Sequence, residues 1–410
     1  MSENPFVAYL KERLPLVESA LDGAAARPLA SKIEPEADLE RYLYAPLAGF
    51  TKGGGKRVRP VLCLLGAEAT GGKASLALAP AVGIELFQSA ALIHDDIADE
   101  SELRRGAPCL YLTEGTGLAT NMGDLALTQV FEVVLGDAAL PAERKASVLA
   151  ELVSMERHTL EGQALDLGWA RDGRWDVTEA DYLYMVTSKT AHYTAASPLA
   201  IGAVAAGATR EAVEGLRQVG VSAGIAFQLQ DDLLNLVGDA EAQGKDFRSD
   251  ITEGKRTLAV VYALANLAEA ERAELVAILE SATTEDDKLA RAVELIEAGG
   301  GIAHCEQLAD REALRHGAVL REARELDVDK RGHAPAKPQA HACDDIKETQ
   351  MEPIREGMTG TAVEDVQERL ASLGYEIADD ERSASQFGAS TANAVARFRL
   401  EHGLSLSTEV

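Results

Sequence analysis

The sequence predicts an all-α protein, and three observations support this fold class. The 410-residue chain is 46% hydrophobic and 26% charged, which is typical of a globular protein. Aromatic residues make up only 5%, alanine, leucine and glutamate are abundant, and runs typical of β-strands are scarce. Hydrophobic residues recur at helical spacing in successive segments. A chain of this length can hold one large domain and a small one, or two to three domains of average size.

The first half of the chain is expected to form helices that glycines, prolines and polar turns separate. A long apolar lead-in predicts a helix that begins near residue 76, and Gly106 with Pro108 should stop it. Gln163 and Asp166 stand alone on a later helix, so we expect them to be structural or supporting residues. The expected helices cover 58–69, 76–100, 121–136 and 145–168, after two helices within 1–50 that a polar turn at 26–34 separates.

The second half continues with helices and then changes character. The segments 181–207 and 221–239 are apolar, and 258–326 is amphipathic with a break at 298–301. From 327 to 350 there are two prolines, few apolar residues and no periodicity, which indicates a linker. Helical spacing resumes beyond it. We therefore expect a large domain at 1–326, a linker at 327–350 and a small α-helical segment at 351–410.

Charge and composition exclude several classes of protein. The net charge of −27 argues against nucleic acid as a general partner, so an anionic substrate would need local cations or metals. The N-terminus lacks a signal-peptide core, and no run of about 18 uncharged apolar residues predicts a membrane span. The cysteines have no metal-type spacing, and a reducing cytoplasm fits them best. They are Cys63, Cys109, Cys305 and Cys343.

The central stretch of the sequence is ELFQSAALIHDDIADESELRRG, from Glu85 to Gly106. On a helix, Asp95 and Asp99 lie one turn apart on one face, with Asp96 beside them. Clustered carboxylates repel unless a cation compensates them, and hard oxygen donors favour Mg²⁺. A solvated acidic helix end remains open as the alternative at this point.

A second apolar helix, within 221–239, carries Asp231 and Asp232. Asn235 stands where a third aspartate would repeat the first motif. Two acidic motifs on separate apolar helices are more informative than either alone. They predict two helices that face each other across a cavity, with metals between them.

Basic residues gather in three places. TKGGGKRVRP, at 51–60, combines flexible glycines with Lys56, Arg57 and Arg59, which suits a phosphate, although an ordinary basic loop remains open. Lys189 interrupts an apolar helix and either extends to solvent or points into a polar pocket. The polar loop after the second acidic motif supplies Lys245, Lys255 and Arg256.

Taken in order, GGGKRVR, HDDIAD with RRG, SKTAHY, FQLQDD and EGKRT resemble the trans-isoprenyl diphosphate synthases, or polyprenyl synthetases. The resemblance covers roughly residues 5–325. It implies an isoprenoid synthase-type helical bundle around a central cavity, usually in a homodimer. The implied activity is Mg²⁺-dependent condensation of isopentenyl diphosphate with an allylic diphosphate, with three Mg²⁺ ions per active site.

The resemblance also implies roles for individual residues. Asp95 and Asp99 would bind Mg²⁺ with support from Asp96, and Asp231 would bind a further Mg²⁺ with Asp232 beside it. An amide at Asn235 is a weaker ligand, so reduced metal affinity is expected. The residues implied to hold the allylic diphosphate are Arg104, Lys189, Lys245 and Lys255. Those implied to hold isopentenyl diphosphate are Gly55, Lys56, Arg59, Gln88 and Arg105. Those implied to line the reacting centre are Thr190, Tyr193 and Gln228, and we count Arg104, Lys189, Thr190 and Gln228 as catalytic.

The residues before the first motif bear on product length. Ala90 and Ala91 lie about one turn below Asp95 and leave the cavity open there. Phe87 lies two turns below, roughly 12 Å beneath the metal site at about 1.5 Å per residue. We expect Phe87 to form the cavity floor and to give C20 to C25 products; plain core packing of Phe87 is the alternative.

Two other functions remain open. A terpene cyclase, or an enzyme that condenses two diphosphates head to head, could share this fold, although the isopentenyl-type basic residues argue for elongation. A non-catalytic subunit of a heteromeric prenyl synthase is the second alternative. The segment 351–410 resembles the first two helices of a peptidoglycan-binding module, is expected to be incomplete, and is assigned no ligand.

Overall fold

The computed structural model is all-α apart from one short hairpin, as predicted. It describes residues 4–24, 35–238 and 248–315, and parts of 358–395. The chain divides into two compact units, Met1–His333 and Ala334–Val410. The predicted linker at 327–350 lies outside the described residues, so its boundaries remain a prediction.

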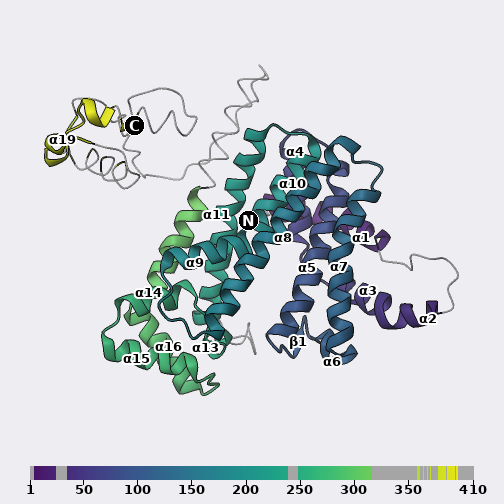
Figure 1. The fold of residues 1–410 in the computed structure, drawn as a ribbon, viewed down its shortest axis with the longest axis horizontal. Helices are drawn as coiled ribbons and strands as arrows, with labels where there is room; N and C mark the ends of the chain where they lie inside the picture. Colours follow the sequence, from purple (N-terminus) through teal and green to yellow (C-terminus); the bar gives the residue numbers. More distant parts are fainter. Residues whose placement is uncertain are drawn as a thin grey trace. The chain divides into compact units, whose positions relative to one another are not determined.

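The first unit is built from helices that follow one another along the chain (Figure 1). A further helix at 301–315 follows the last labelled one. The elements up to the hairpin are α1 (Pro5–Gly23), α2 (Glu36–Leu39), η1 (Glu40–Tyr44), α3 (Ala45–Lys52), α4 (Val58–Ala69), η2 (Ala74–Leu76), α5 (Leu78–Ala98), β1 (Leu103–Arg104) and β2 (Ala107–Pro108). Those after it are α6 (Leu110–Glu114), α7 (Thr116–Gly136), α8 (Ala142–Arg171), α9 (Glu179–Val186), η3 (Thr187–Ala196), α10 (Ser197–Ala206), α11 (Arg210–Val237), α13 (Ser249–Thr252), α14 (Leu258–Asn266), α15 (Glu269–Glu280) and α16 (Asp286–Ala298).

Helix α5 is the central helix of this unit, because nearly every residue in its first three turns is buried. It runs beside α7 (Figure 1), and Ile84, Leu86 and Phe87 share a core with Val130 and Val134 of α7. Such all-round burial matches a sequence with apolar residues on every face, among which Glu85 and Gln88 are buried polar exceptions. The C-terminal end of α5 is thereby held rigidly where the first acidic motif begins.

Helix boundaries agree with the prediction at some places and differ at others. The helix expected at 58–69 is α4, with the same limits. The helix expected at 121–136 begins five residues earlier, at Thr116. The chain after α5 was not expected to form strands. Leu103 pairs with Pro108 there, and Arg104 with Ala107, in an antiparallel hairpin.

The segment 181–207 differs most from the prediction, which was one continuous helix. Its middle part, η3, is π-helical over ten residues, between the α-helical α9 and α10. It packs between α8 and α11. A Cβ on Gly224 of α11 would lie 2.4 Å from the Ala191 Cα atom of η3, so only glycine allows this approach. The extra residue in each π-turn changes which side chains of η3 face the cavity.

Arg57 does not have the phosphate-facing role that its neighbours suggested. Its side chain is 1% exposed, and it donates to Glu85 at 2.6 Å, to Glu18 at 2.8 Å and to the Thr51 carbonyl at 2.8 Å. Its backbone is left-handed at φ 50°, directly before α4. Arg57 therefore ties α1, the glycine loop and α5 together as a structural residue.

The second unit has a small core of its own. Val363, Leu370, Phe387 and Val395 are buried together. The Glu381 carboxylate accepts the backbone N–H groups of Gly388, Ser390 and Thr391, and these bonds lower the pKa of Glu381 to about 2 although burial acts against them. In the segment 351–410, which was expected to be α-helical, the described residues 391, 392, 394 and 395 are helical, and 396–410 lie outside the described residues. In the parts of the chain described here, no helix is long and apolar enough to cross a membrane.

The buried Arg57 to Glu85 pair gives a stability prediction. Replacing Arg57 by Ala should lower the free energy of unfolding by about 3–5 kcal/mol, because Glu85 is left charged and unpaired in the core. The exposed Lys52 to Asp22 pair at 3.0 Å offers a control, since Lys52→Ala should change stability by less than about 1 kcal/mol. Urea unfolding followed by circular dichroism measures both, and equal losses in the two variants would contradict the assignment.

Candidate active site

Two adjoining cavities lie among α5, α8, η3 and α11. The first has a volume of about 310 Å³, and mostly polar side chains of α8, η3, α11 and the segment 250–257 line it. The second has a volume of about 240 Å³, and mostly apolar side chains of α5, α7, α8 and η3 line it. Lys189, Thr190 and Tyr193 line both. A polar compartment and a hydrocarbon compartment therefore meet at η3.

The first acidic motif lies at the C-terminal end of α5. Asp95 lines the apolar cavity and accepts a hydrogen bond from Gln163 Nε2 of α8 at 2.7 Å. Asp99 ends the helix, and its backbone N–H donates to the Asp95 carbonyl at 2.8 Å. Burial raises the pKa of Asp99 to about 6, and repulsion from Asp95 acts in the same direction. The predicted one-turn spacing of these carboxylates is thus present.

Asp96 points the other way. It is 2% exposed, accepts from Arg104 Nε at 2.9 Å, and lines neither cavity among the described residues. Arg104 also donates to it through Nη2. The pairing fastens the hairpin to the end of α5. The implied roles of Asp96 at the metal and of Arg104 at the diphosphate remain predictions.

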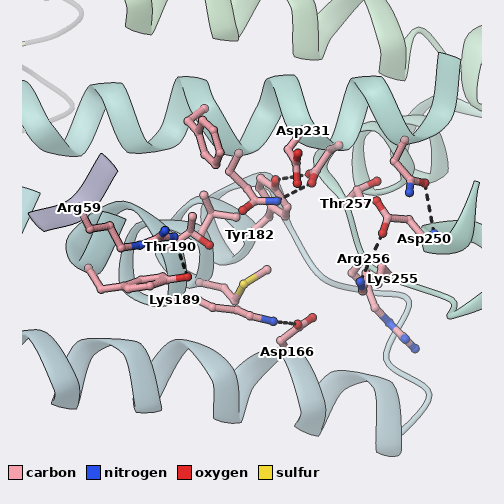
Figure 2. Close-up of a pocket in the computed structure, with 17 residues that line it drawn as sticks. Arg59, Asp166, Tyr182, Lys189, Thr190, Asp231, Asp250, Lys255, Arg256 and Thr257 are labelled. Atoms are coloured by element: carbon pink, nitrogen blue, oxygen red, sulfur yellow. Dashed lines mark hydrogen bonds and ion pairs between the residues drawn. The ribbon is translucent and has the colours of Figure 1, made fainter. Parts of the chain in front are cut away.

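The second acidic motif lies on α11, across the polar cavity from α8 (Figure 2). Asp231 lines the cavity, and burial raises its pKa while Lys255 opposes this. Asp232 is buried and accepts from the Tyr182 hydroxyl and from Gln228 Nε2, each at 2.7 Å. Burial and repulsion from Asp250 raise the pKa of Asp232 to about 7. Gln228 therefore holds the Asp232 carboxylate in place and also lines the cavity.

Two lysines connect these acidic groups. Lys189 Nζ donates to Asp166 on α8, and this contact raises the pKa of Lys189 although burial opposes it. Lys255 Nζ lies 2.8 Å from Glu253 and 3.3 Å from Asp250. Both lysines oppose the rise in the pKa of Asp99, although burial outweighs them. Lys255 also opposes the rise at Asp231, so one cation acts on both acidic motifs.

The loop before α4 and the hairpin bring further cations together. Arg59 lines the polar cavity, donates to the Tyr193 hydroxyl at 2.9 Å and stacks on that ring at 4.3 Å. A Cβ on Gly55 would lie 3.4 Å from Arg105 Nη2, so these two residues are neighbours. Lys56 is exposed beside them. Gln88 is buried, and its Oε1 has no hydrogen-bond partner among the described residues.

Of the three residues expected to bear on product length, two line the apolar cavity. Phe87 and Ala91 line it, whereas Ala90 packs in a core with Leu47 and Met122. Phe87 meets Tyr193 edge-on, with ring centroids 6.0 Å apart. Ala91 and not Ala90 therefore leaves this part of the cavity open.

Gln163 and Asp166 were expected to be supporting residues, and their contacts agree, because they hold Asp95 and Lys189. Two other residues of the site were missed in the sequence. Tyr182 and Asp250 were not singled out, and a search for the polar residues of SDITEGK beyond the second motif could have found Asp250. Lys245 lies outside the described residues, so nothing is said of its position.

The donor set fits Mg²⁺. Each acidic motif contributes one or two carboxylates at the cavities, and Mg²⁺ typically takes one or two carboxylates plus water and substrate phosphates. Mg²⁺ at either motif would draw the rest of its coordination from water and substrate phosphates.

Comparison with known proteins agrees with this geometry. A sequence profile of the polyprenyl synthetase family matches residues 40–296, and one of the peptidoglycan binding domain family matches 359–408. The chain is 40% identical over 276 residues to a short chain isoprenyl diphosphate synthase of Methanothermobacter thermautotrophicus. The matched region covers 67% of this chain and 81% of the relative. It is 38% identical over 266 residues to a geranylfarnesyl diphosphate synthase of Aeropyrum pernix, across 63% and 80%.

Solved structures agree as well. Geranylgeranyl pyrophosphate synthetase from Pyrococcus horikoshii matches with a TM-score of 0.67 and 31% identity, over 78% of this chain and 94% of that one. Geranylgeranyl pyrophosphate synthase from Corynebacterium glutamicum, complexed with isoprenyl diphosphate and magnesium, matches with a TM-score of 0.63 and 28% identity, over 80% and 98%. The chain belongs to the polyprenyl synthetase family and is a prenyltransferase.

The position of Lys189 depends on a close approach of η3 to α8. A Cβ on Gly162 would lie 2.3 Å from the Lys189 nitrogen. Gly162→Ala should push η3 away, lower stability by about 1–3 kcal/mol and slow prenyl transfer about 100-fold. Gly168→Ala on the same helix meets nothing within 4 Å and should retain activity. Steady-state rates and urea unfolding of both variants check this, and a fully active Gly162→Ala enzyme would contradict it.

Glu156 gives a pH-dependent prediction. It lies one helical turn before Thr159 and Leu160 of the apolar cavity, and its Oε1 is buried without a partner among the described residues. Burial raises the pKa of Glu156 from 4.5 to about 7. The folded protein therefore binds this proton more tightly than the unfolded one, and the associated stability is lost as pH rises through about 7.

Glu156→Gln removes this loss. The melting temperature of the variant minus that of the native protein should rise as pH increases from about 5 to 8. Glu12→Gln, at a surface pair with Arg13, serves as the control and should give a flat difference. A flat difference for Glu156→Gln as well would show that Glu156 is not protonated in the folded protein.

Proposed function

We propose that this protein condenses isopentenyl diphosphate with an allylic diphosphate, giving a longer trans-prenyl diphosphate and diphosphate. The observation that carries the proposal is the junction of a cation-bearing polar cavity with an apolar one at Lys189, Thr190 and Tyr193. The charged head of an allylic substrate belongs on the polar side and its hydrocarbon tail on the other. The named relatives and structures support the same substrate class.

Each compartment has a chemical task. Lys189 and Lys255 stabilise the negative charge that develops as the allylic C–O bond breaks and its electron pair moves to the diphosphate. The apolar cavity keeps water from the carbon cation. The double bond of isopentenyl diphosphate forms the new C–C bond, and the released diphosphate takes the proton. Thr190, Tyr193 and Gln228 surround the reacting centre.

Asp95, Asp99 and Asp231 would hold Mg²⁺, with three ions per active site when both substrates are bound. Bound Mg²⁺ supplies positive charge to the leaving diphosphate. Isopentenyl diphosphate would be held by Arg59 and Lys56, together with the neighbouring residues Gly55 and Arg105. Support for this second diphosphate site comes from Arg59 in the cavity wall and from the left-handed glycine backbone before α4. A cyclase has only one diphosphate to bind and does not need these cations.

The direct test is incubation with labelled isopentenyl diphosphate and C5, C10 or C15 allylic diphosphates, with and without Mg²⁺. Elongated products that require both Mg²⁺ and an allylic primer are expected. Asp95→Asn and Asp231→Asn should each reduce the rate by at least about 100-fold. Release of cyclic hydrocarbons without use of isopentenyl diphosphate would identify a cyclase instead. No product under any condition would favour a non-catalytic subunit.

A homodimer is part of the proposal. Val153, Leu160 and Leu167 repeat every seven residues along α8 and are 52%, 65% and 41% exposed. Arg157 and Glu161 lie beside this apolar stripe, and antiparallel pairing of two α8 helices would bring opposite charges together across a two-fold axis. Light scattering should give a dimer mass that Val153→Asp shifts toward the monomer, while Leu314→Asp, an exposed site on the helix at 301–315, leaves it unchanged.

Product length follows from the cavity floor. Phe87 is 3% exposed and lines the apolar cavity, so Phe87→Ala should lengthen the products beyond C20–C25 by one or more C5 units. Phe131→Ala is the matched control, because Phe131 packs against the same core without lining that cavity. Each truncation costs about 3–5 kcal/mol of stability, so the assays are run well below the melting temperature. Chromatography of dephosphorylated products decides, and identical distributions in both variants would leave Phe87 as core packing alone.

A further inference from the structure

We propose that Asn235 is a positioning residue that fastens the segment 248–255 to the end of α11, and so holds Asp250 and Lys255 at the polar cavity. The inference rests on the proposed function, because it assigns these two side chains to the diphosphate end of that site. Asn235 occupies the third acidic position of the second motif, where a carboxylate would repeat the first.

The contacts of Asn235 carry the first step. Its Nδ2 donates to Ser249 Oγ at 3.0 Å, and its Oδ1 accepts the Asp250 N–H at 3.2 Å. Its backbone carbonyl accepts the Arg248 N–H at 2.9 Å. One residue of α11 thus binds three consecutive residues at the start of α13.

The fastened segment leads directly to the cavity. Arg248 has a left-handed backbone at φ 60°, which is uncommon outside glycine and needs its surroundings to hold it. The Lys255 N–H donates to the Asp250 carbonyl at 2.9 Å, and the Lys255 ammonium lies 3.3 Å from the Asp250 carboxylate. Asp250 and Lys255 both line the polar cavity (Figure 2). If the Asn235 amide moved, Asp250 would move with it, and the Lys255 ammonium would then shift in the cavity.

The amide suits this task better than a carboxylate would. An amide both donates and accepts, so it satisfies Ser249 Oγ and the Asp250 N–H without adding charge. A carboxylate at 235 would add a further negative charge close to Asp231, Asp232 and Asp250, and would repel them when no cation is bound. Asn235 therefore holds the segment at the cavity without adding to this repulsion.

The first experiment does not depend on enzymatic activity. Hydrogen exchange of the peptide containing 248–256 is measured in the full-length protein without metal or substrate. Asn235→Ala and Ser249→Ala should both speed exchange there, because each removes one side of the same hydrogen bond. Asn266→Ala is the matched control, since Asn266 Nδ2 donates to the Tyr262 carbonyl at 2.8 Å on exposed α14 surface, and it should leave the peptide unchanged. Unchanged exchange in Asn235→Ala would overturn the proposal.

The second arm uses steady-state kinetics. Asn235→Ala should raise KM for the allylic diphosphate about tenfold, as expected for losing a bond and leaving its partner unsatisfied. Its KM for isopentenyl diphosphate should stay within about twofold of the native value. Ser249→Ala should shift the same constant. The double variant should be no worse than Asn235→Ala, because Asn235→Ala already removes the bond to Ser249 Oγ together with the bond to the Asp250 N–H.

A metal-ligand role for Asn235 predicts a different pattern. In that case Asn235→Ala would raise only the Mg²⁺ concentration needed for half-maximal activity, and Ser249→Ala would behave as the native protein. That outcome would overturn the proposal. Absence of prenyl transfer in the native protein would instead refute the proposed function, and the exchange experiment would still decide whether Asn235 fastens the segment.

Discussion

Two lysines shared among carboxylates of several helices hold the site together. Lys189 of η3 pairs with Asp166 of α8, and Lys255 pairs with Asp250 and Glu253 while its charge also acts on Asp99 and Asp231. Without these cations the acidic ends of α5 and α11 would repel each other across the cavities. In the proposed function, a diphosphate at these lysines would replace internal carboxylates at both. Substrate binding would then be an exchange of partners, with the protein supplying the first ones.

Lys189 reaches its carboxylate partner from η3, which is held tightly on both sides. Gly162 of α8 and Gly224 of α11 remove the side chains that would separate these helices from the η3 backbone. The contact is one of backbone against backbone, so it leaves little freedom for the side chains between them. Lys189 and Thr190 therefore point into the junction of the cavities from a rigid support, which is what a reaction with an unstable cation requires.

The sequence predicted what depends on local spacing. Asp95 and Asp99 lie one turn apart in any helix, and apolar periodicity found α4, α5, α8 and α11. It could not predict η3, because a π-turn is selected by packing and has no periodicity of its own over so few residues. Arg57 looked like its cationic neighbours until the burial of Glu85 gave it a partner. Ala90 and Ala91 differ only by about 100° around the helix axis, and only the position of α7 decides which one faces the cavity.

A single chain encloses the apolar cavity only in part. Its inner wall is well packed, since Phe87 and Thr159 are buried. Its outer wall includes Leu160 and Leu167, which are 65% and 41% exposed and belong to the apolar stripe of α8. A carbon cation beside a wall open to water would be captured before it reacted. The proposed homodimer would cover this stripe, so the same α8 surface that joins two copies would also dry the hydrocarbon compartment of each.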